Sequence, residues 1–337
     1  MIFREINFPE LKNLIVKKLL LIFLGILLSE KLFCWGFFAH QKINYYAVFL
    51  LPPEMIVLYK SHISFLSDHS VDPDKRRYTL AAEGARHFID IDHYGVYPFP
   101  ELPRKWDSAA AKYSVDSLRR YGIVPWWILI MKQRLTQAFR EKNQMKILRL
   151  SAEIGHYIAD AHVPLHVSSN HNGQLTHQEG IHAFWESRIP ELLAEKEWDF
   201  FIGQATYIRD PATFIWARIL ESAASADTVL RYEKQLGSSF REDLKYAFEE
   251  RNGKLTRQYS AAYSISYDRK LDHMIERRMR ASIGAVASFW YSSWVDAGQP
   301  DLKNLVNQHL SEADMKEFQV LDEEWKKGKL LGDGREE

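Results

Sequence analysis

A pair of potential metal ligands within an apolar helical pattern constrains this chain most strongly. His156 and Asp160 are four residues apart, so on a helix their side chains lie on the same face. Pro164 has no N–H and disfavours helical geometry at Val163, so we expect the helix to end there. His166 would then lie just past the helix end, where it can turn back toward that face.

A second pair, His182 and Glu186, repeats this spacing further along the chain. Imidazole and carboxylate groups at this spacing are what a zinc ion requires from helices. One pair alone is often only a solvated pair on a helix surface. Two pairs on either side of a further histidine predict a metal site.

The composition leaves room for a large core and excludes a general polyanion-binding surface. The 337 residues are enough for one large domain or two small ones, and 46% of them are hydrophobic. The 44 basic and 44 acidic side chains give a formal net charge of zero, whereas a polyanion-binding surface shows a basic excess. Any attraction for phosphate must therefore be local, and a bound metal can supply it.

Residues 1–34 have the pattern of a secretory signal peptide. Lysines precede the apolar run Leu19–Leu28, which is too short to span a bilayer but suits the hydrophobic region of such a peptide. Cleavage after Cys34 would leave a mature chain that begins at Trp35 and contains no cysteine, so we expect export to the periplasm or the extracellular space. A longer membrane anchor and acylation of Cys34 are the alternatives.

Helical periodicity dominates the rest of the chain, and no alternating apolar run of strand length stands out. A Pro-Pro break at 52–53 starts one helix. Further helices are expected at residues 107–120, 123–140, 142–162, 210–235, 238–258 and 267–295. The sequence therefore predicts an all-α fold, with a single multi-helix domain at 35–325 and a charged flexible tail at 326–337.

Other candidate ligands lie closer to the N-terminus. His87 could complete the site with Asp72 or Asp74, although a single histidine is more often a surface or core residue. At the start of the mature chain, the α-amine has an ordinary pKa of about 8, so a metal can displace its proton and bind the nitrogen. The amine and carbonyl of Trp35, together with His40, could therefore hold one ion.

Four motifs occupy the first half of the mature chain. They are Trp-Gly-x-x-x-His at 35–40, His-Phe-x-Asp at 87–90, His-x3-Asp-x5-His ending in Pro-Leu-His at 156–166, and His-x3-Glu at 182–186. In combination they resemble the motifs of the trinuclear-zinc phosphodiesterases. This superfamily contains the bacterial zinc-dependent phospholipases C and the single-strand-specific zinc nucleases, and the resemblance implies their compact all-helical fold.

The resemblance implies three zinc positions. The first would be held by four side chains: Asp74, His87, His156 and Asp160. The second would be held by three: His166, His182 and Glu186. The third would take the amine and carbonyl of Trp35, a ring nitrogen of His40 and a bridging oxygen of Asp160. We choose Asp74 for the first position because Asp-Lys-Arg-Arg at 74–77 resembles the Asp-x-x-Arg element of the family, with Asp72 as the alternative.

The resemblance also implies hydrolysis of a phosphodiester. Three carboxylates against three divalent ions leave the cavity cationic, which attracts a phosphodiester anion to an otherwise neutral protein. Zinc lowers the pKa of bound water, so that a hydroxide can attack phosphorus while another zinc stabilises the leaving oxygen. Asp74 and Asp160 would be the catalytic residues: the first would orient or deprotonate the water, and the second would bridge two ions.

Two substrate classes fit these motifs. Glu186 and the short separation between His166 and His182 resemble the phospholipases, whereas the Trp-Gly-x-x-x-His spacing resembles the nucleases, of the endonuclease and 3′-nucleotidase type. We favour a monomeric phospholipase C-like enzyme that contacts a membrane surface transiently, with single-stranded nucleic acid as the alternative substrate. The alternative of another class is a non-catalytic, zinc-stabilised helical binding protein. A ligand set of only three residues argues against it, because one zinc position stays open.

Overall fold

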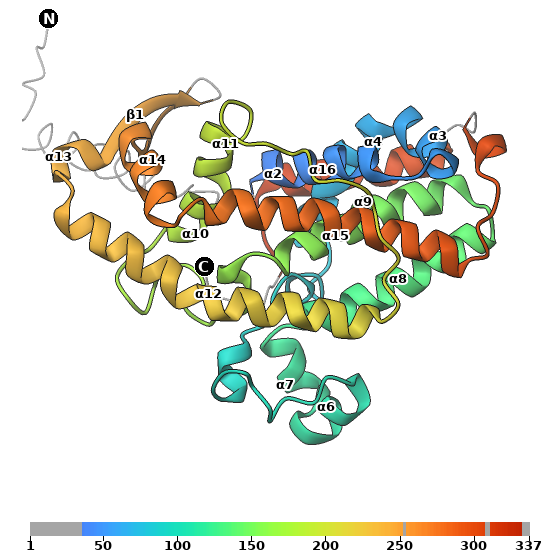
Figure 1. Ribbon diagram of the computed structural model, residues 1–337, viewed down its shortest axis with the longest axis horizontal. Coiled ribbons are helices and arrows are strands. Elements are labelled where there is room, and N and C mark those ends of the chain that lie inside the picture. Colours follow the sequence, from blue (N-terminus) through green and yellow to red (C-terminus); the bar gives the residue numbers. More distant parts are fainter. Residues whose placement is uncertain (1–35, 252–253, 307–310, 332–337) are drawn as a thin grey trace, which may run out of the picture. The chain divides into compact units, whose positions relative to one another are not determined.

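Residues 36–251, 254–306 and 311–331 are described by the computed structural model, and most of them are helical (Figure 1). The fold is all-α, as the sequence predicted. Its small two-stranded sheet is a hairpin of β1 (Tyr246–Arg251) and β2 (Lys254–Tyr259). Residues 33–337 form a unit of their own. The expected signal peptide at 1–34 lies outside the described residues. None of the described helices combines the length and apolar character needed to cross a membrane.

The helix predicted around His156 lies at the centre of the fold as α9 (Gln144–Asp160). Asn143 caps it, because its side-chain oxygen accepts a hydrogen bond from the backbone N–H of Lys146. Every residue from 151 to 160 is buried, so the ligand pair at its C-terminal end belongs to the core. The helix ends at Asp160, and Pro164 opens a short 3-10 turn, η5 (Pro164–Val167), as the proline predicted.

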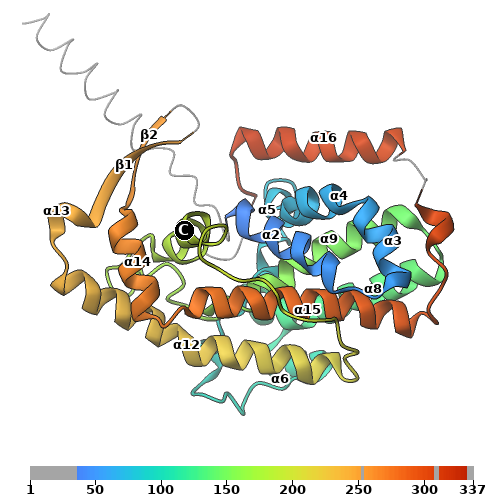
Figure 2. The ribbon, with the colours of Figure 1, turned by 45° about the horizontal axis from the view of Figure 1, so that its top comes forward.

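Three long elements pack around α9: α2 (Phe37–Ala47), α8 (Val124–Arg140) and α15 (Met274–Asp296). The longest helix, α12 (Pro211–Ser239), lies against α8 and η5, and Figure 2 shows it running along the side of α15. The crossing of α2 and α9 is close at Gly155. A Cβ atom there would lie 2.0 Å from the Asn44 Oδ1 atom, so only glycine fits.

Shorter elements complete the described part of the chain. The remaining α-helices are α3 (Pro53–Ser61), α4 (Ile63–Asp68), α5 (Asp72–Arg76), α6 (Trp106–Tyr113), α7 (Val115–Arg120), α10 (Ile181–Ala183), α11 (Ile189–Leu193), α13 (Glu242–Lys245), α14 (Ala261–Lys270) and α16 (Glu312–Lys327). The 3-10 turns are η1 (Val48–Leu50), η2 (His69–Val71), η3 (Gly84–Arg86), η4 (Ile91–Tyr94) and η7 (Lys303–Leu305), and η6 (Phe184–Arg188) is a π-helical turn.

The expected helix at 238–258 is wrong. The chain instead leaves α12 at Ser239 and forms α13 and the β hairpin, in which Tyr246 pairs with Tyr259 and Phe248 with Arg257. Aromatic and β-branched residues favour strands, and an Asn-Gly pair between two such runs is a strong hairpin signal that the helical reading missed.

Two other expected helices are interrupted. The segment 107–120 is divided between α6 and α7, because Ser114 has a φ of 69° and caps α7 with its hydroxyl. The segment 267–295 is divided between α14 and α15, where Asp272 and His273 both have positive φ. His273 also forms a hydrogen bond with Asp268, between Nδ1 and Oδ2 at 2.7 Å, which fixes this turn.

The chain after α15 contains a helix that the sequence analysis did not predict. This helix, α16, begins with a capping box at Ser311 and continues to Lys327, past the start of the expected tail. Beyond it, the Leu331 N–H donates to the Arg77 carbonyl oxygen at 3.2 Å. Residues 332–337 lie outside the described residues. The helix α16 packs against α5.

Candidate metal centre

The carboxylate of Asp160, at the end of α9, lies between four imidazoles. Its Oδ2 atom is 3.1 Å from His87 Nδ1 and 3.3 Å from His156 Nε2. Its Oδ1 atom is 3.5 Å from His40 Nε2 and 3.8 Å from His166 Nε2. All five side chains are buried. Residues from α2, the segment after η3, α9 and η5 therefore meet at one carboxylate.

The structure distinguishes the two candidate aspartates. Asp74 Oδ1 lies 3.6 Å from His156 Nε2 and 3.7 Å from His87 Nδ1, so this residue belongs to the cluster. Asp72 faces away from it: its Oδ2 atom is 2.6 Å from His69 Nδ1, and its Oδ1 atom is 3.5 Å from Lys75 Nζ. Both aspartates lie on the short helix α5, two residues apart, so their side chains point in different directions.

The second predicted pair forms an adjoining group with His166. His182 Nε2 is 3.0 Å from Glu186 Oε2, and His166 Nε2 is 3.5 Å from the same oxygen. The two ring nitrogens are 3.3 Å apart. His182 lies in α10 and Glu186 in the π-helical turn η6, so the four-residue spacing still brings the two side chains together. Gly180, with φ of 90°, starts this helical segment.

Backbone carbonyls fix the orientation of three of these imidazoles. The Nδ1 atom of His156 is 2.8 Å from the Ser70 oxygen, that of His166 is 2.9 Å from the His87 oxygen, and that of His182 is 3.1 Å from the His171 oxygen. A carbonyl only accepts, so each Nδ1 must carry the proton. In the neutral rings, each Nε2 then points a lone pair into the cluster. Histidines that bind metals are commonly held in this way.

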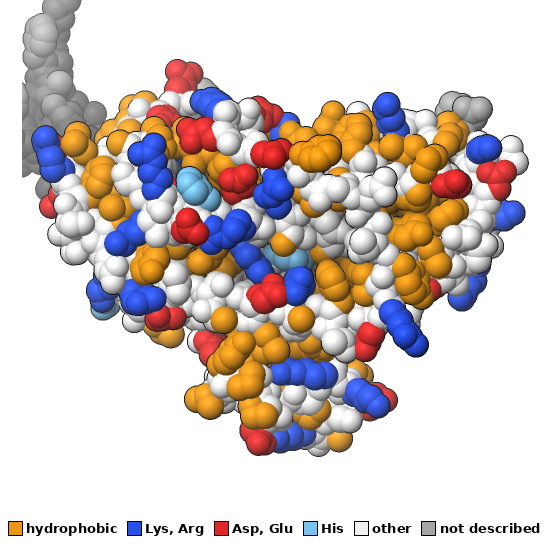
Figure 3. Space-filling model, in the orientation of Figure 1, with side chains coloured by type: hydrophobic (Ala, Val, Ile, Leu, Met, Phe, Trp, Pro, Cys, Tyr) orange, Lys and Arg blue, Asp and Glu red, His pale blue; other side chains and the backbone are white. Residues whose placement is uncertain are grey.

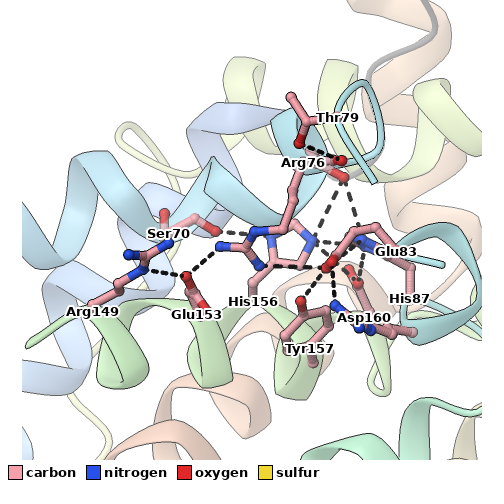
Figure 4. A network of polar contacts seen from close by, with 12 residues as sticks. Ser70, Arg76, Thr79, Glu83, His87, Arg149, Glu153, His156, Tyr157 and Asp160 are labelled. Carbon is pink, nitrogen blue, oxygen red and sulfur yellow. Dashed lines mark hydrogen bonds and ion pairs between the residues drawn. The ribbon is translucent and has the colours of Figure 1, made fainter. Parts of the chain in front are cut away.

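A buried glutamate that the sequence analysis did not identify lies behind His87 (Figure 4). Glu83 Oε1 is 3.8 Å from His87 Nε2, on the side of the ring that faces away from Asp160. The same carboxylate accepts a hydrogen bond from Tyr157 and pairs with Arg76. Burial opposes ionisation of Glu83, but the guanidinium of Arg76 holds its pKa below the usual range. Glu83 lies in irregular chain, where no periodicity marks it.

Charge in the cluster is strongly perturbed. Burial tends to lower the pKa of His156, but the carboxylates of Asp160 and Asp74 raise it to about 9. Burial also opposes ionisation of Asp160, yet His156 and His166 hold its pKa well below the usual range. Burial raises the pKa of Asp74. Burial, and then His156, lower the pKa of His40 well below its ordinary value. Neighbouring charges thus favour the ionised forms of His156 and Asp160, whereas burial favours the neutral forms of Asp74 and His40.

The donor atoms fit a divalent cation. Three groups each place their ligand atoms within 4.8 Å of one another: His40, Asp74 and His156; His87, His156 and Asp160; and His166, His182 and Glu186. Within the described residues, neither carboxylate oxygen of Asp74 nor the Oδ1 of Asp160 has a hydrogen-bond partner. Buried carboxylate oxygens without partners cost free energy, which a cation among these imidazoles would recover. Several groups in this cluster can thus hold a metal ion.

Eight of the predicted ligands are described, and all eight belong to these three neighbouring groups. The ninth, Trp35, lies outside the described residues. His162 does not belong to the cluster. Its side chain is buried elsewhere, and its Nδ1 donates to the Ile158 carbonyl oxygen at 2.7 Å. His177, in the loop between the two motifs, is exposed.

Comparison with known proteins gives no family for this chain. No family model matches the sequence, and no curated protein matches it. The functional argument therefore depends on the motifs and on the geometry of the cluster.

Proposed function

We propose that this protein is an exported zinc-dependent phosphoric diester hydrolase of the phospholipase C type. The observation that carries the proposal is the Asp160 carboxylate, whose two oxygens face different histidine pairs, His87 with His156 and His40 with His166. A carboxylate so placed can serve two cations at once, as the resemblance to the trinuclear-zinc phosphodiesterases implies.

Zinc bound here supplies positive charge that attracts a phosphodiester and lowers the pKa of water. Asp74, whose Oδ1 atom lies beside His87 and His156, is the carboxylate placed to orient the attacking water or accept its proton. Asp160 stays ionised, since His156 and His166 hold its pKa low. Glu83 keeps His87 oriented from behind.

The second ligand group favours catalysis over a purely structural role. His166, His182 and Glu186 offer three ligands, whereas structural zinc sites are normally closed by four. A position left for substrate is typical of catalytic zinc. The side chains of all three residues are buried in the protein.

The test is hydrolysis by purified, zinc-loaded protein, with phosphatidylcholine vesicles compared with single-stranded DNA. We expect cleavage of the lipid, with loss of activity and of bound zinc in Asp160→Asn and Glu186→Gln. His177→Asn is the matched control, because His177 is exposed and its positive φ suits asparagine. Cleavage of DNA with the same dependence would assign the protein to the nuclease branch instead. Zinc binding without hydrolysis of either would favour a non-catalytic binding protein.

A further inference from the structure

A pocket of about 510 Å³ lies between α12, the loop after His166 and the segment around η4. This volume is in the range of small-molecule sites. The apolar part of its lining consists of Ile91, Phe99, Val167, Ala223, Ala226 and Leu230. Val167 directly follows the candidate ligand His166 in the turn η5, so the loop that lines the pocket begins next to a candidate ligand.

Two polar side chains of the pocket wall, Asp92 and Gln178, form hydrogen bonds within the protein. Asp92 accepts hydrogen bonds from the Ser168 hydroxyl at 3.1 Å and from the Ser169 backbone N–H at 3.0 Å. Gln178 donates to the Leu230 carbonyl oxygen at 2.8 Å. These hydrogen bonds join the loop after His166 to η4 on one side and to α12 on the other. This part of the wall is therefore fixed, and Asp92 and Gln178 are already engaged within the protein.

The mouth of the pocket carries cations from one face of α12. Arg231 and Lys234 both line it and are exposed. Arg231 Nε is 3.4 Å from Asp227 Oδ2, but among the described residues no acidic side chain pairs with Lys234. At least one positive charge at the mouth is thus available to an anion.

Large apolar side chains project from the two segments that form the other walls. Val96 is 81% exposed and Tyr97 is 57% exposed, and the Tyr97 ring is 5.9 Å from that of Phe99 in the pocket lining. Leu175 is 68% exposed, next to Thr176 of the lining. Figure 3 shows hydrophobic side chains gathered on the lobe that contains α6 and α7. Apolar groups, a tyrosine and nearby cations are the features of a surface that enters a lipid interface.

We propose that this face docks on a phospholipid membrane: Val96, Tyr97 and Leu175 enter the interface, the pocket takes an apolar part of one lipid, and Lys234 pairs with phosphate. The inference names the substrate class of the proposed function and rests on it for the link to catalysis. Single-stranded nucleic acid fits this face less well. Such a partner uses a cationic groove with several aromatic platforms, and this rim offers one tyrosine among aliphatic side chains.

The test is binding to vesicles of equal parts phosphatidylcholine and phosphatidylglycerol, measured by co-sedimentation with EDTA present so that hydrolysis does not intervene. We expect Val96→Asp with Leu175→Asp to weaken binding more than about tenfold, and Lys234→Ala to weaken it about fivefold at low salt, with a smaller effect at high salt. Each variant should unfold thermally at the same midpoint temperature as the wild type, which shows that its fold is intact.

Phe201→Asp and Phe248→Asp are the matched controls, because these side chains are 87% and 67% exposed but do not line the pocket. Unchanged binding in both supports the docking face. Loss of binding in either control but not in the Val96 and Leu175 variant overturns it, as does failure of the wild type to bind vesicles. Binding of single-stranded DNA that Lys234→Ala abolishes would also overturn it. Hydrolysis of soluble bis(4-nitrophenyl) phosphate by the zinc-loaded wild type tests the proposed function separately.

Discussion

Arg149 of α9 and Glu317 of α16 form a bidentate salt bridge, in which Nη1 donates to Oε2 at 2.8 Å and Nη2 donates to Oε1. Arg149 also donates from Nε to Glu153 at 3.2 Å. The C-terminal helix is in this way joined to the helix that carries His156 and Asp160.

Further ion pairs connect Glu153 to the candidate metal centre. Arg76 donates to Glu153 and lies 3.6 Å from Glu83, which in turn faces His87 (Figure 4). A row of alternating charges thus runs from the protein surface to a candidate ligand. The helix α16 supports the same region through Lys75, whose Nζ donates to Asp322 at 2.7 Å.

Glu317→Gln should lower the free energy of unfolding by about 0.2–1 kcal/mol, since the pair is partly exposed and solvent screens it. Arg149 holds the pKa of Glu317 below its ordinary value of 4.5, so the pair stabilises the fold above that pH. The difference between wild type and variant should close as the pH falls through the lowered pKa. Urea unfolding at pH 7 and pH 3 measures both effects, with Glu179→Gln, at an exposed loop residue, as control. An equal difference at the two pH values would contradict the pairing.

Glu83→Gln should be far more damaging, because Glu83 is fully buried. The variant removes the carboxylate that pairs with Arg86 and leaves Arg76 paired with Glu153 alone. Loss of one partner of a buried pair costs about 3–5 kcal/mol. His87 also loses the group behind it, so zinc affinity should fall about 10- to 100-fold. Calorimetry of zinc binding at a temperature where the variant is folded measures this. Glu101→Gln removes an exposed carboxylate and is the control. If Glu83→Gln binds zinc with wild-type affinity, Glu83 does not position His87 for metal binding.

Gly155→Ala should destabilise the crossing of α2 and α9 by about 1–3 kcal/mol. The new Cβ would meet Asn44, which is held in place by hydrogen bonds to the carbonyl oxygens of Leu66 and Ala152 at 2.9 and 3.0 Å. Gly284→Ala is the matched control on α15, because its Cβ would have an ordinary contact of 3.6 Å with Ile202. Alanine favours helix, so the control should be neutral or stabilising by up to about 1 kcal/mol. Equal effects of the two substitutions on thermal unfolding would contradict the close crossing.

Zinc should stabilise the protein against unfolding. At a free concentration of about 100 times Kd, one bound ion adds about 2.7 kcal/mol, and EDTA should remove this gain. Asp160→Asn should lower the number of ions bound by more than one. The reason is that one carboxylate oxygen of Asp160 faces His87 and the other faces His166. Metal analysis after dialysis counts the ions, with His177→Asn as the unaffected control. Full stoichiometry in Asp160→Asn would show that this carboxylate is not shared.

The exported chain should begin at Trp35. Mass spectrometry of the protein recovered from the periplasm or medium measures the terminus directly. If the α-amine is a ligand beside His40, then one alanine added before Trp35 should lower the zinc count by one. A mature chain that begins elsewhere, with the same number of bound ions, would contradict the role of the terminus.

Two pairs of candidate ligands could be found from sequence because helical spacing is local. His156 with Asp160, and His182 with Glu186, lie on common faces whatever the rest of the chain does. The end of α9 follows in the same way from Pro164, whose ring forbids continuation of the helix. The helix wrongly expected at 238–258 shows the limit of periodicity, because this segment forms the pair of strands β1 and β2 instead.

The tertiary structure decided what lies between and behind these ligands. Asp72 and Asp74 are nearly equivalent in sequence, and only the packing of α5 turns Asp74 toward His87 and Asp72 toward His69. Glu83 and α16 became visible only when distant segments met. The sequence alone thus indicated the two pairs of candidate ligands and the helical segments that carry them, since both depend on neighbours within a few residues. Their assembly around Asp160, their orientation and their charge depend on burial and on long-range contacts, which no local pattern encodes.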